Sequence, residues 1–306
     1  MFDTHCHLNF KAFKNSYDQV IKDAYKVGVK NIVIPGTDIE TSQKAVEIAE
    51  KYNGVYAAVG IHPHHVYQDQ KSKIKDQKLK LKIKNINVGK THYFSNPDVG
   101  ADFMSARLLE LEKLLIHPKV VAIGEVGIDK HQYSITKYQK YIVNNQFVQT
   151  QKDLLVRQIK LAIKCKKSLI LHNREAKKEM LEILSTYWDK KLEGRTVFHC
   201  CEPDEGLLDF AIKHHIFIGV DGDVTYSKEK QEFVKKIPLE MLVLETDSPL
   251  LLPEPLRSKK LYPNKPGNLV LIVDYIAKLR KQSKELIIKQ TVQNSLKLFS
   301  INFNSR

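Results

Sequence analysis

Short apolar segments rich in β-branched residues alternate with longer amphipathic segments along most of this chain of 306 residues. We expect strands at residues 2–8, 31–37, 55–63, 120–129, 168–174, 196–200, 216–223 and 242–247. Helical patterns fall between them, for example at residues 41–52, 104–115, 151–167 and 175–188. This alternation predicts a parallel sheet of the α/β class. Eight such units favour a closed (β/α)8 TIM barrel over an open doubly wound sheet, so we predict a single domain over residues 1–306.

Two segments follow neither the strand pattern nor the helix pattern, and we predict that both are insertions. Residues 67–102 are rich in Lys, Gln and Asn, and residues 130–147 contain several tyrosines. Both follow predicted strands, so both should leave the barrel as surface loops on its C-terminal face. Either the lysines of these insertions add affinity for a polyanion such as DNA, or the insertions are disordered segments without a role. We favour the second interpretation.

The composition is that of an ordinary globular protein, with 42% hydrophobic and 27% charged residues. No segment approaches the roughly 18 consecutive apolar residues of a membrane span. The first residues lack the basic-then-apolar order of a secretory signal, and four cysteines are too few for a disulfide framework. We therefore expect a cytoplasmic or nuclear protein, with non-classical export left open. The net charge of +14 attracts polyanions, but it supports nucleic acid only weakly.

Ionisable side chains gather near the ends of the predicted strands. His5 and His7 lie two residues apart, so we expect them on one face of a strand, together with Asp3. Other strands end at or near His62, Glu125, His172, His199, Glu245 and Asp247. In a barrel these ends meet on one face. Such a mixture of imidazoles and carboxylates suits Zn, Mn, Fe or Mg, and a central carboxylate such as Glu125 can bridge two ions. Asp247 could bind metal, accept a proton from water, or do both.

Neighbouring residues receive weaker interpretations. His64 and His65 are expected at the surface, and Cys6 is expected in the core, facing away from the histidines on either side. Cys200 should face outward, whereas Cys201 could return toward the site, where a thiolate ligand is the minor alternative.

The motifs DTHCHL, GIHPH, IGEVGID, LHNREA, FHC, IGVDGDVTY and LETDSPLLLP occur in this order. Together they resemble the TatD family of metal-dependent deoxyribonucleases, within the amidohydrolase-like metallo-hydrolase superfamily. The resemblance runs from Phe2 to about Phe299. It implies a TIM barrel that cleaves DNA with two divalent ions, Mg²⁺ or Mn²⁺ in function and Zn²⁺ as an alternative, and often with 3′-to-5′ exonuclease action.

The resemblance also implies roles for individual residues. His5, His7 and Asp247 would hold one metal, while Glu125, His172 and His199 would hold the other, with Glu125 bridging. Glu125 and Asp247 would be catalytic, and His62 and Arg174 would lie near the substrate phosphate. We further expect Glu245 to orient one of the metal-binding side chains without binding the metal itself.

The segment after His199 departs from the family pattern. The family usually continues with a small glycine-containing turn, whereas this chain reads HCCEPDE. Glu202 and Asp204 are therefore expected to place negative charge beside a site that should receive phosphate. This leaves the substrate geometry open, although it does not affect the predicted metal binding.

Two rival hypotheses remain beside a DNA phosphodiesterase. The same centre could hydrolyse an ester or amide, such as an aminoacyl-tRNA ester, because an activated water does not itself choose phosphorus over carbon. A non-catalytic nucleic-acid-binding barrel would need a damaged centre, and no predicted ligand position is damaged. The sequence does not indicate an oligomeric state.

Overall fold

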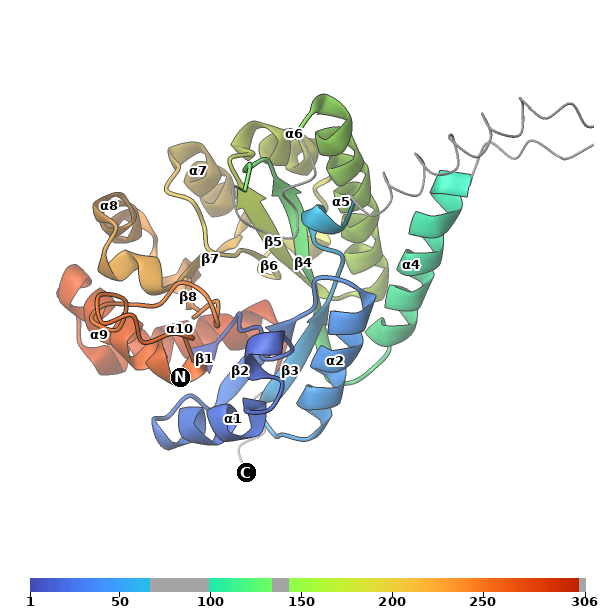
Figure 1. Cartoon of the computed structure of the whole chain (residues 1–306). Coiled ribbons are helices and arrows are strands. Elements are labelled where there is room, and N and C mark those ends of the chain that lie inside the picture. The colour runs from blue at the N-terminus through green and yellow to red at the C-terminus, as the bar shows by residue number, and fades with distance from the viewer. Residues whose placement is uncertain (67–98, 134–142, 303–306) are drawn as a thin grey trace, which may run out of the picture.

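The computed structural model describes residues 1–66, 99–133 and 143–302, and its centre is one sheet of eight parallel strands in chain order (Figure 1). The strands are β1 (Phe2–Asp3), β2 (Asn31–Pro35), β3 (Val55–Val59), β4 (Val120–Asp129), β5 (Ser168–Arg174), β6 (Thr196–Phe198), β7 (Phe217–Val220) and β8 (Leu242–Leu244). Just beyond β1, the backbone N–H of Thr4 donates to the carbonyl of Leu244 at 3.0 Å, which brings the first and last strands together. The predicted (β/α)8 barrel is therefore confirmed.

Helices follow the strands and cover the outside of the barrel (Figure 1). They are α1 (Tyr17–Lys26), α2 (Ile39–Glu50), α4 (Val99–Leu115), α5 (Asn145–Cys165), α6 (Lys177–Tyr187), α7 (Glu205–His214), α8 (Lys228–Lys236), α9 (Leu269–Arg280) and α10 (Lys284–Leu298). Short 3-10 helices include η2 (Pro63–His65) after β3 and η4 (Gly222–Thr225) after β7. No helix within the described ranges is long and apolar enough to cross a membrane.

The inside of the barrel is filled by a layer that takes one buried apolar residue from each strand. These residues are Phe2, Val33, Ala58, Ala122, Ile170, Val197, Phe217 and Val243. Leu298 and Phe299, at the end of α10, pack against the same layer. A second, larger cluster contains other strand residues and the buried faces of the helices. Because side chains alternate along a strand, residues two and four positions beyond the inner layer point into the barrel near its C-terminal face.

The first strand is shorter than predicted. It ends at Asp3, and only an isolated bridge between Cys6 and Ser248 continues the pairing. The prediction that Asp3 shares a face with the two histidines is wrong. Its carboxylate instead accepts hydrogen bonds from the backbone N–H and the hydroxyl of Thr246, at 3.0 and 2.6 Å. Through these contacts Asp3 joins the two ends of the barrel and is not part of the histidine cluster. Burial raises the pKa of this carboxyl group to about 8.

The predicted insertions fall mostly on residues 67–98 and 134–142, which lie outside the described residues. The end of the first predicted insertion, residues 99–102, belongs to α4. The end of the second, residues 145–147, belongs to α5.

Candidate metal centre

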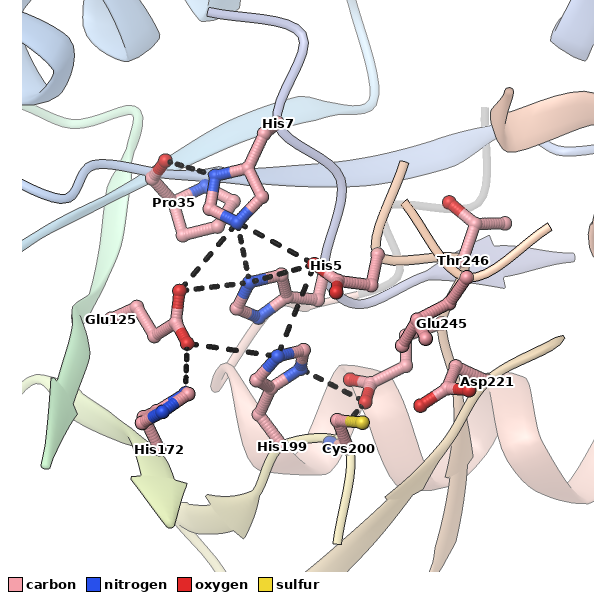
Figure 2. A network of polar contacts seen from close by, with 12 residues as sticks. His5, His7, Pro35, Glu125, His172, His199, Cys200, Asp221, Glu245 and Thr246 are labelled. Atoms are coloured by element: carbon pink, nitrogen blue, oxygen red, sulfur yellow. Dashed lines mark hydrogen bonds and ion pairs between the residues drawn. The ribbon is translucent and has the colours of Figure 1, made fainter. Parts of the chain in front are cut away.

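The candidate site lies at the C-terminal end of the barrel, directly beyond the inner layer. His172, His199 and Glu245 each come two residues after an inner-layer residue of their strand, and Asp247 comes four residues after one. The period of two therefore directs His172, His199 and Glu245 into the barrel. Asp247 has a left-handed backbone, with a φ of 48°, and its place in the cluster is given by its contacts with His5 and His7. His5 and His7 come from the segment after β1, and Figure 2 shows them meeting the other residues around Glu125.

Glu125 is the centre of the cluster, and its two oxygens face different imidazoles (Figure 2). Oε2 lies 3.5 Å from Nε2 of both His5 and His7. Oε1 lies 2.6 Å from Nδ1 of His172 and 3.7 Å from Nε2 of His199. Burial opposes ionisation of Glu125, but the nearby histidines outweigh it and hold the pKa well below its usual range. An ionised carboxylate thus lies between two groups of imidazoles.

The spacing of these atoms fits ligands around a shared cation. The Nε2 atoms of His5 and His7 are 3.1 Å apart, and Oδ1 of Asp247 lies 3.5 Å from the second and 3.8 Å from the first. Ligands about 2.0–2.2 Å from a divalent ion lie roughly 3.0–3.5 Å from one another in octahedral or tetrahedral geometry. The predicted ligand residues are therefore together in space, at distances that suit a metal.

Three of the imidazoles have one ring nitrogen beside an oxygen acceptor, through a hydrogen bond in His7 and His172 and through a close ion-pair contact in His199. Nδ1 of His7 lies 3.3 Å from the carbonyl of Pro35, and Nδ1 of His199 lies 2.9 Å from Oε1 of Glu245. Nε2 of His172 lies 3.0 Å from Oδ2 of Asp129. An acceptor at one nitrogen keeps the proton there and leaves the lone pair of the other nitrogen available to a metal. Each free nitrogen faces Glu125, as a metal site requires.

Burial keeps other members of the cluster in the neutral form that binds metal. Desolvation, together with the neighbouring imidazoles, lowers the pKa of His5 to about 3 and that of His199 to about 4. His172 differs, because Glu125 and Asp129 outweigh burial and raise its pKa to about 10. Without a cation, His172 is therefore the group that carries the compensating positive charge.

His62 is close to the cluster, but it directs an N–H donor toward Glu125, whereas His7 and His172 direct toward it the nitrogen that can bind a metal. Its Nδ1 accepts the backbone N–H of His64 at 3.2 Å, so the neutral ring carries its proton on Nε2. That Nε2 lies 3.6 Å from Oε1 of Glu125. Burial lowers the pKa of His62 to about 3, which keeps the ring neutral. His62 therefore offers a hydrogen-bond donor to the site, although its distance to Glu125 and His172 alone would also allow metal binding.

Asp129 is a buried residue of the site that the sequence analysis missed. Its Oδ2 lies 3.0 Å from Nε2 of both His172 and His64, and it accepts the hydroxyl of Tyr133 at 2.8 Å. The expectation that His64 and His65 lie at the surface is wrong, because they are only 7% and 3% exposed. Asp129 lies four residues after Glu125 on β4, so the period of two was the signal that could have found it.

Arg174 lies at the exposed end of β5, beside the cluster. Its Nη1 donates to the hydroxyl of Tyr133 at 3.0 Å, and its guanidinium carbon is 5.0 Å from the centre of that ring. Tyr133 in turn donates to Asp129. A chain of contacts therefore joins the predicted phosphate-binding arginine to the carboxylate that holds His172.

The two acidic residues of the HCCEPDE segment have local structural partners. Glu202 accepts the side-chain amide of Asn173 at 2.9 Å and the backbone N–H of Glu175 at 3.1 Å. Asp204 caps the N-terminus of α7 by accepting the backbone N–H of Leu207 at 3.0 Å. These contacts hold the segments after β5 and β6, and the effect of the two carboxylates on a bound phosphate stays a prediction.

The cysteines do not follow their predicted directions throughout. Cys6 is fully buried in the large apolar cluster, as expected. Cys201 is also buried there, which does not support the minor alternative that it binds metal as a thiolate. Cys200 has a positive φ of 43°, and its sulfur instead lies near the carboxylates of Asp221 and Asp223. The left-handed backbone at Cys200 ends the strand alternation on which the prediction depended.

The fold and this cluster together define a class of protein, a (β/α)8-barrel hydrolase that depends on metal. The family described as TatD related DNase matches residues 2–300. The chain therefore belongs to the TatD-related DNase family, which confirms the resemblance drawn from its motifs.

Individual relatives match over nearly the whole chain. An uncharacterized metal-dependent hydrolase of Bacillus subtilis is 30% identical over 304 residues, which cover 99% of this chain and 100% of the relative. A protein of Escherichia coli named 3′-5′ ssDNA/RNA exonuclease TatD is 28% identical over 307 residues, with 99% and 100% covered. The crystal structure of a TatD homologue from Escherichia coli superposes with a TM-score of 0.75 at 24% identity and covers 99% of this chain and 98% of that one.

Proposed function

We propose that this protein is a nuclease that hydrolyses DNA phosphodiester bonds with two divalent metal ions. The observation that carries this proposal is the position of Glu125, whose two oxygens face separate groups of imidazoles. A carboxylate with ligands on both sides is suited to bridging two cations. The names of two relatives also support a nucleic-acid substrate, since one is a human deoxyribonuclease and another is the exonuclease of Escherichia coli.

The ligands divide into two groups. His5, His7 and Asp247 would hold one ion, His172 and His199 would hold the other, and Glu125 would be shared. When bound, the two ions would supply an activated water and neutralise the charge that develops on the phosphoryl oxygens. The mixture of nitrogen and oxygen ligands accepts Mg²⁺, Mn²⁺ or Zn²⁺, so the metal is identified by the assay below.

Other residues would bind and orient the phosphate. His62 carries its proton on Nε2 and would donate it in a hydrogen bond to a phosphate oxygen. Arg174 is exposed beside the site, where its guanidinium can pair with the same phosphate. Asp247, whose Oδ1 lies 3.8 Å from His5 and 3.5 Å from His7, would accept a proton from the attacking water.

Cleavage assays on linear single-stranded and double-stranded DNA, labelled at either the 3′ or the 5′ end, test the proposal. Wild type, Glu125→Gln and Asp247→Asn are compared in EDTA, Mg²⁺, Mn²⁺ and Zn²⁺. Glu182→Gln is the matched control, because Glu182 is an exposed carboxylate on α6. We expect metal-dependent cleavage in wild type and the control, with a loss of at least 100-fold in both site variants. A 3′-to-5′ exonuclease would release the 3′ label first.

Two results would contradict the proposal. Cleavage that survives in both site variants would mean that another group, or a contaminant, performs the reaction. A metal-loaded wild type that cleaves no DNA but hydrolyses aminoacyl-tRNA would establish the ester-hydrolase alternative.

A further inference from the structure

Close to the turn that follows His199 lies a group of charged residues that the proposed reaction does not use. The group contains Lys230 of α8, Asp221 at the N-cap of η4, and Asp223 within η4. Lys230 is only 1% exposed, and Asp221 is fully buried. Lysine is almost never fully buried unless it is paired, so its position here needs an explanation.

Lys230 makes two contacts that join α8 to the turn after β6. Its Nζ donates to the backbone carbonyl of Cys201 at 2.6 Å, and it lies 3.3 Å from Oδ2 of Asp223. Burial opposes the charge of Lys230, but the carboxylates of Asp223 and Asp221 outweigh it and raise the pKa. The ammonium group is therefore charged. It donates a hydrogen bond to Cys201 and is the counter-ion of Asp221 and Asp223, which we call the acidic pair.

The turn that Lys230 holds also carries His199. Its backbone is fixed by Glu245, whose Oε1 accepts the N–H of Cys200 at 2.5 Å, and by the carbonyl of Gly219, which accepts the N–H of Cys201 at 3.3 Å. The same Oε1 of Glu245 holds Nδ1 of His199, as Figure 2 shows. A shift of this turn would therefore move the imidazole of His199 relative to the carboxylate of Glu245.

The acidic pair could be interpreted as a third metal site, since Cys200, Asp221 and Asp223 are close enough to hold a cation together. Lys230 argues against this interpretation. Its ammonium already lies 3.3 Å from Asp223. Burial and the charge of Asp221 raise the pKa of Asp223 well above its usual range, so the two carboxyl groups carry about one negative charge between them, which the ammonium balances.

We infer that Lys230 is a positioning residue for the metal ligand His199, which it holds in place through the backbone carbonyl of Cys201 and by neutralising Asp221 and Asp223. This inference rests on the proposed metal centre. It predicts that loss of Lys230 weakens the ion held by His199 and His172 and leaves the ion held by His5 and His7 largely in place.

Metal titration of the full chain tests the inference, with Mn²⁺ as the probe. Lys230→Met keeps the length of the side chain and removes its charge and its donor. Lys230→Met combined with Asp223→Asn also removes the carboxylate left without a counter-ion. Lys235→Met is the matched control, because Lys235 is an exposed residue of the same helix. Binding of each equivalent of Mn²⁺, the melting temperature, and kcat and KM for DNA are measured for wild type and these three variants. Binding of Mn²⁺ is also measured for Cys200→Ser.

We expect both Lys230 variants to bind one equivalent of Mn²⁺ with nearly wild-type affinity and the other 10- to 100-fold more weakly. At subsaturating Mn²⁺, kcat should fall while KM for DNA stays within twofold, and excess Mn²⁺ should restore kcat. Lys235→Met should behave as wild type. Persistence of the metal defect in the double variant would show that the hydrogen bond to Cys201 contributes in addition to the charge balance.

Several results would overturn the inference. Wild-type affinity for both ions in a folded Lys230→Met protein would show that Lys230 does not position the ligand. Equal weakening of both ions, or failure of both Lys230 variants to fold, would assign Lys230 to the fold as a whole. A third equivalent in wild type that is absent from Cys200→Ser would mean that a metal neutralises the acidic pair. A wild type that binds fewer than two ions would instead contradict the proposed metal centre itself.

Discussion

Glu245 offers a sharp test of how the candidate centre holds its ligands. The carboxylate accepts hydrogen bonds from the N–H of Cys200 and from the hydroxyl of Thr4, and it lies 2.9 Å from Nδ1 of His199. Glu245→Gln preserves the shape of the side chain. The amide oxygen can still accept from His199 and Cys200, and only the negative charge is lost. The variant therefore isolates the electrostatic part of the contact.

The expected magnitude follows from these contacts. A hydrogen bond to a charged acceptor contributes about 1.5–3 kcal/mol, and a neutral one contributes about 1 kcal/mol, so Glu245→Gln should cost roughly 1–1.5 kcal/mol. That corresponds to about a tenfold weaker metal at the site of His199. Glu245→Ala also leaves His199 free to rotate and should cost up to about 100-fold. Burial raises the pKa of Glu245 to about 7, so the comparison belongs at pH 8, where the carboxylate is mostly ionised.

The assay is titration calorimetry with Mn²⁺ at pH 8 on the metal-free chain. Glu240→Gln, which changes an exposed carboxylate near the start of β8, is the control and should match wild type. The order wild type, then Gln, then Ala in decreasing affinity supports the argument. Equal affinities in all of these folded proteins would refute it, because the contact between Glu245 and His199 would then contribute nothing to metal binding.

Three further predictions concern the residues around the centre. Gly219→Ala should weaken metal binding about tenfold or more, measured by the same titration, because an added Cβ would lie 2.6–2.7 Å from the carboxylate atoms of Glu245. Metal binding must displace the proton of His172, whose metal-free pKa of about 10 exceeds the ordinary 6.5. This proton stabilises the metal-free fold fully below pH 6.5, and the stabilisation is lost as the pH rises through 10, so metal affinity should increase up to tenfold per unit between pH 7 and 9. Calorimetry in two buffers of different ionisation enthalpy should detect about one released proton, and a pH-independent affinity would contradict the assignment. Tyr133→Phe removes the hydroxyl that accepts from Arg174, so it should raise KM for DNA several-fold with less effect on kcat, and an unchanged KM would exclude this role.

The architecture was largely predictable because it depends on local patterns. The bounds predicted for the fourth and fifth strands, residues 120–129 and 168–174, are those observed. Both segments are apolar runs with clear ends, and each is buried on two faces, as strands of a barrel are. The placement of His172 and His199 followed from the same reasoning, since each lies at a strand end that must reach the C-terminal face.

The predictions failed where the chain leaves the regular strand geometry. The strand alternation stops at Asp3 and again at Cys200, so the directions expected for the following side chains did not hold. Lys230 could not be recognised, because a lysine on an amphipathic helix normally faces solvent. The burial of His64 was also missed, because His64 lies in η2 and its partner Asp129 lies at the end of β4, more than 60 residues later in the chain.

The sequence by itself therefore determined the order of the elements, the barrel, and the chemical types gathered at one end of it. Those properties follow from periodicity and from the rule that parallel strands in a barrel end on one face. Only the tertiary structure decided which ring nitrogen of each histidine is available, that His62 presents a donor, that His199 is the imidazole beside Glu245, and that Lys230 contacts the carbonyl of Cys201. These features depend on contacts between segments far apart in the chain, within a range of about 3 Å, and the local pattern of residues carries no information about such contacts.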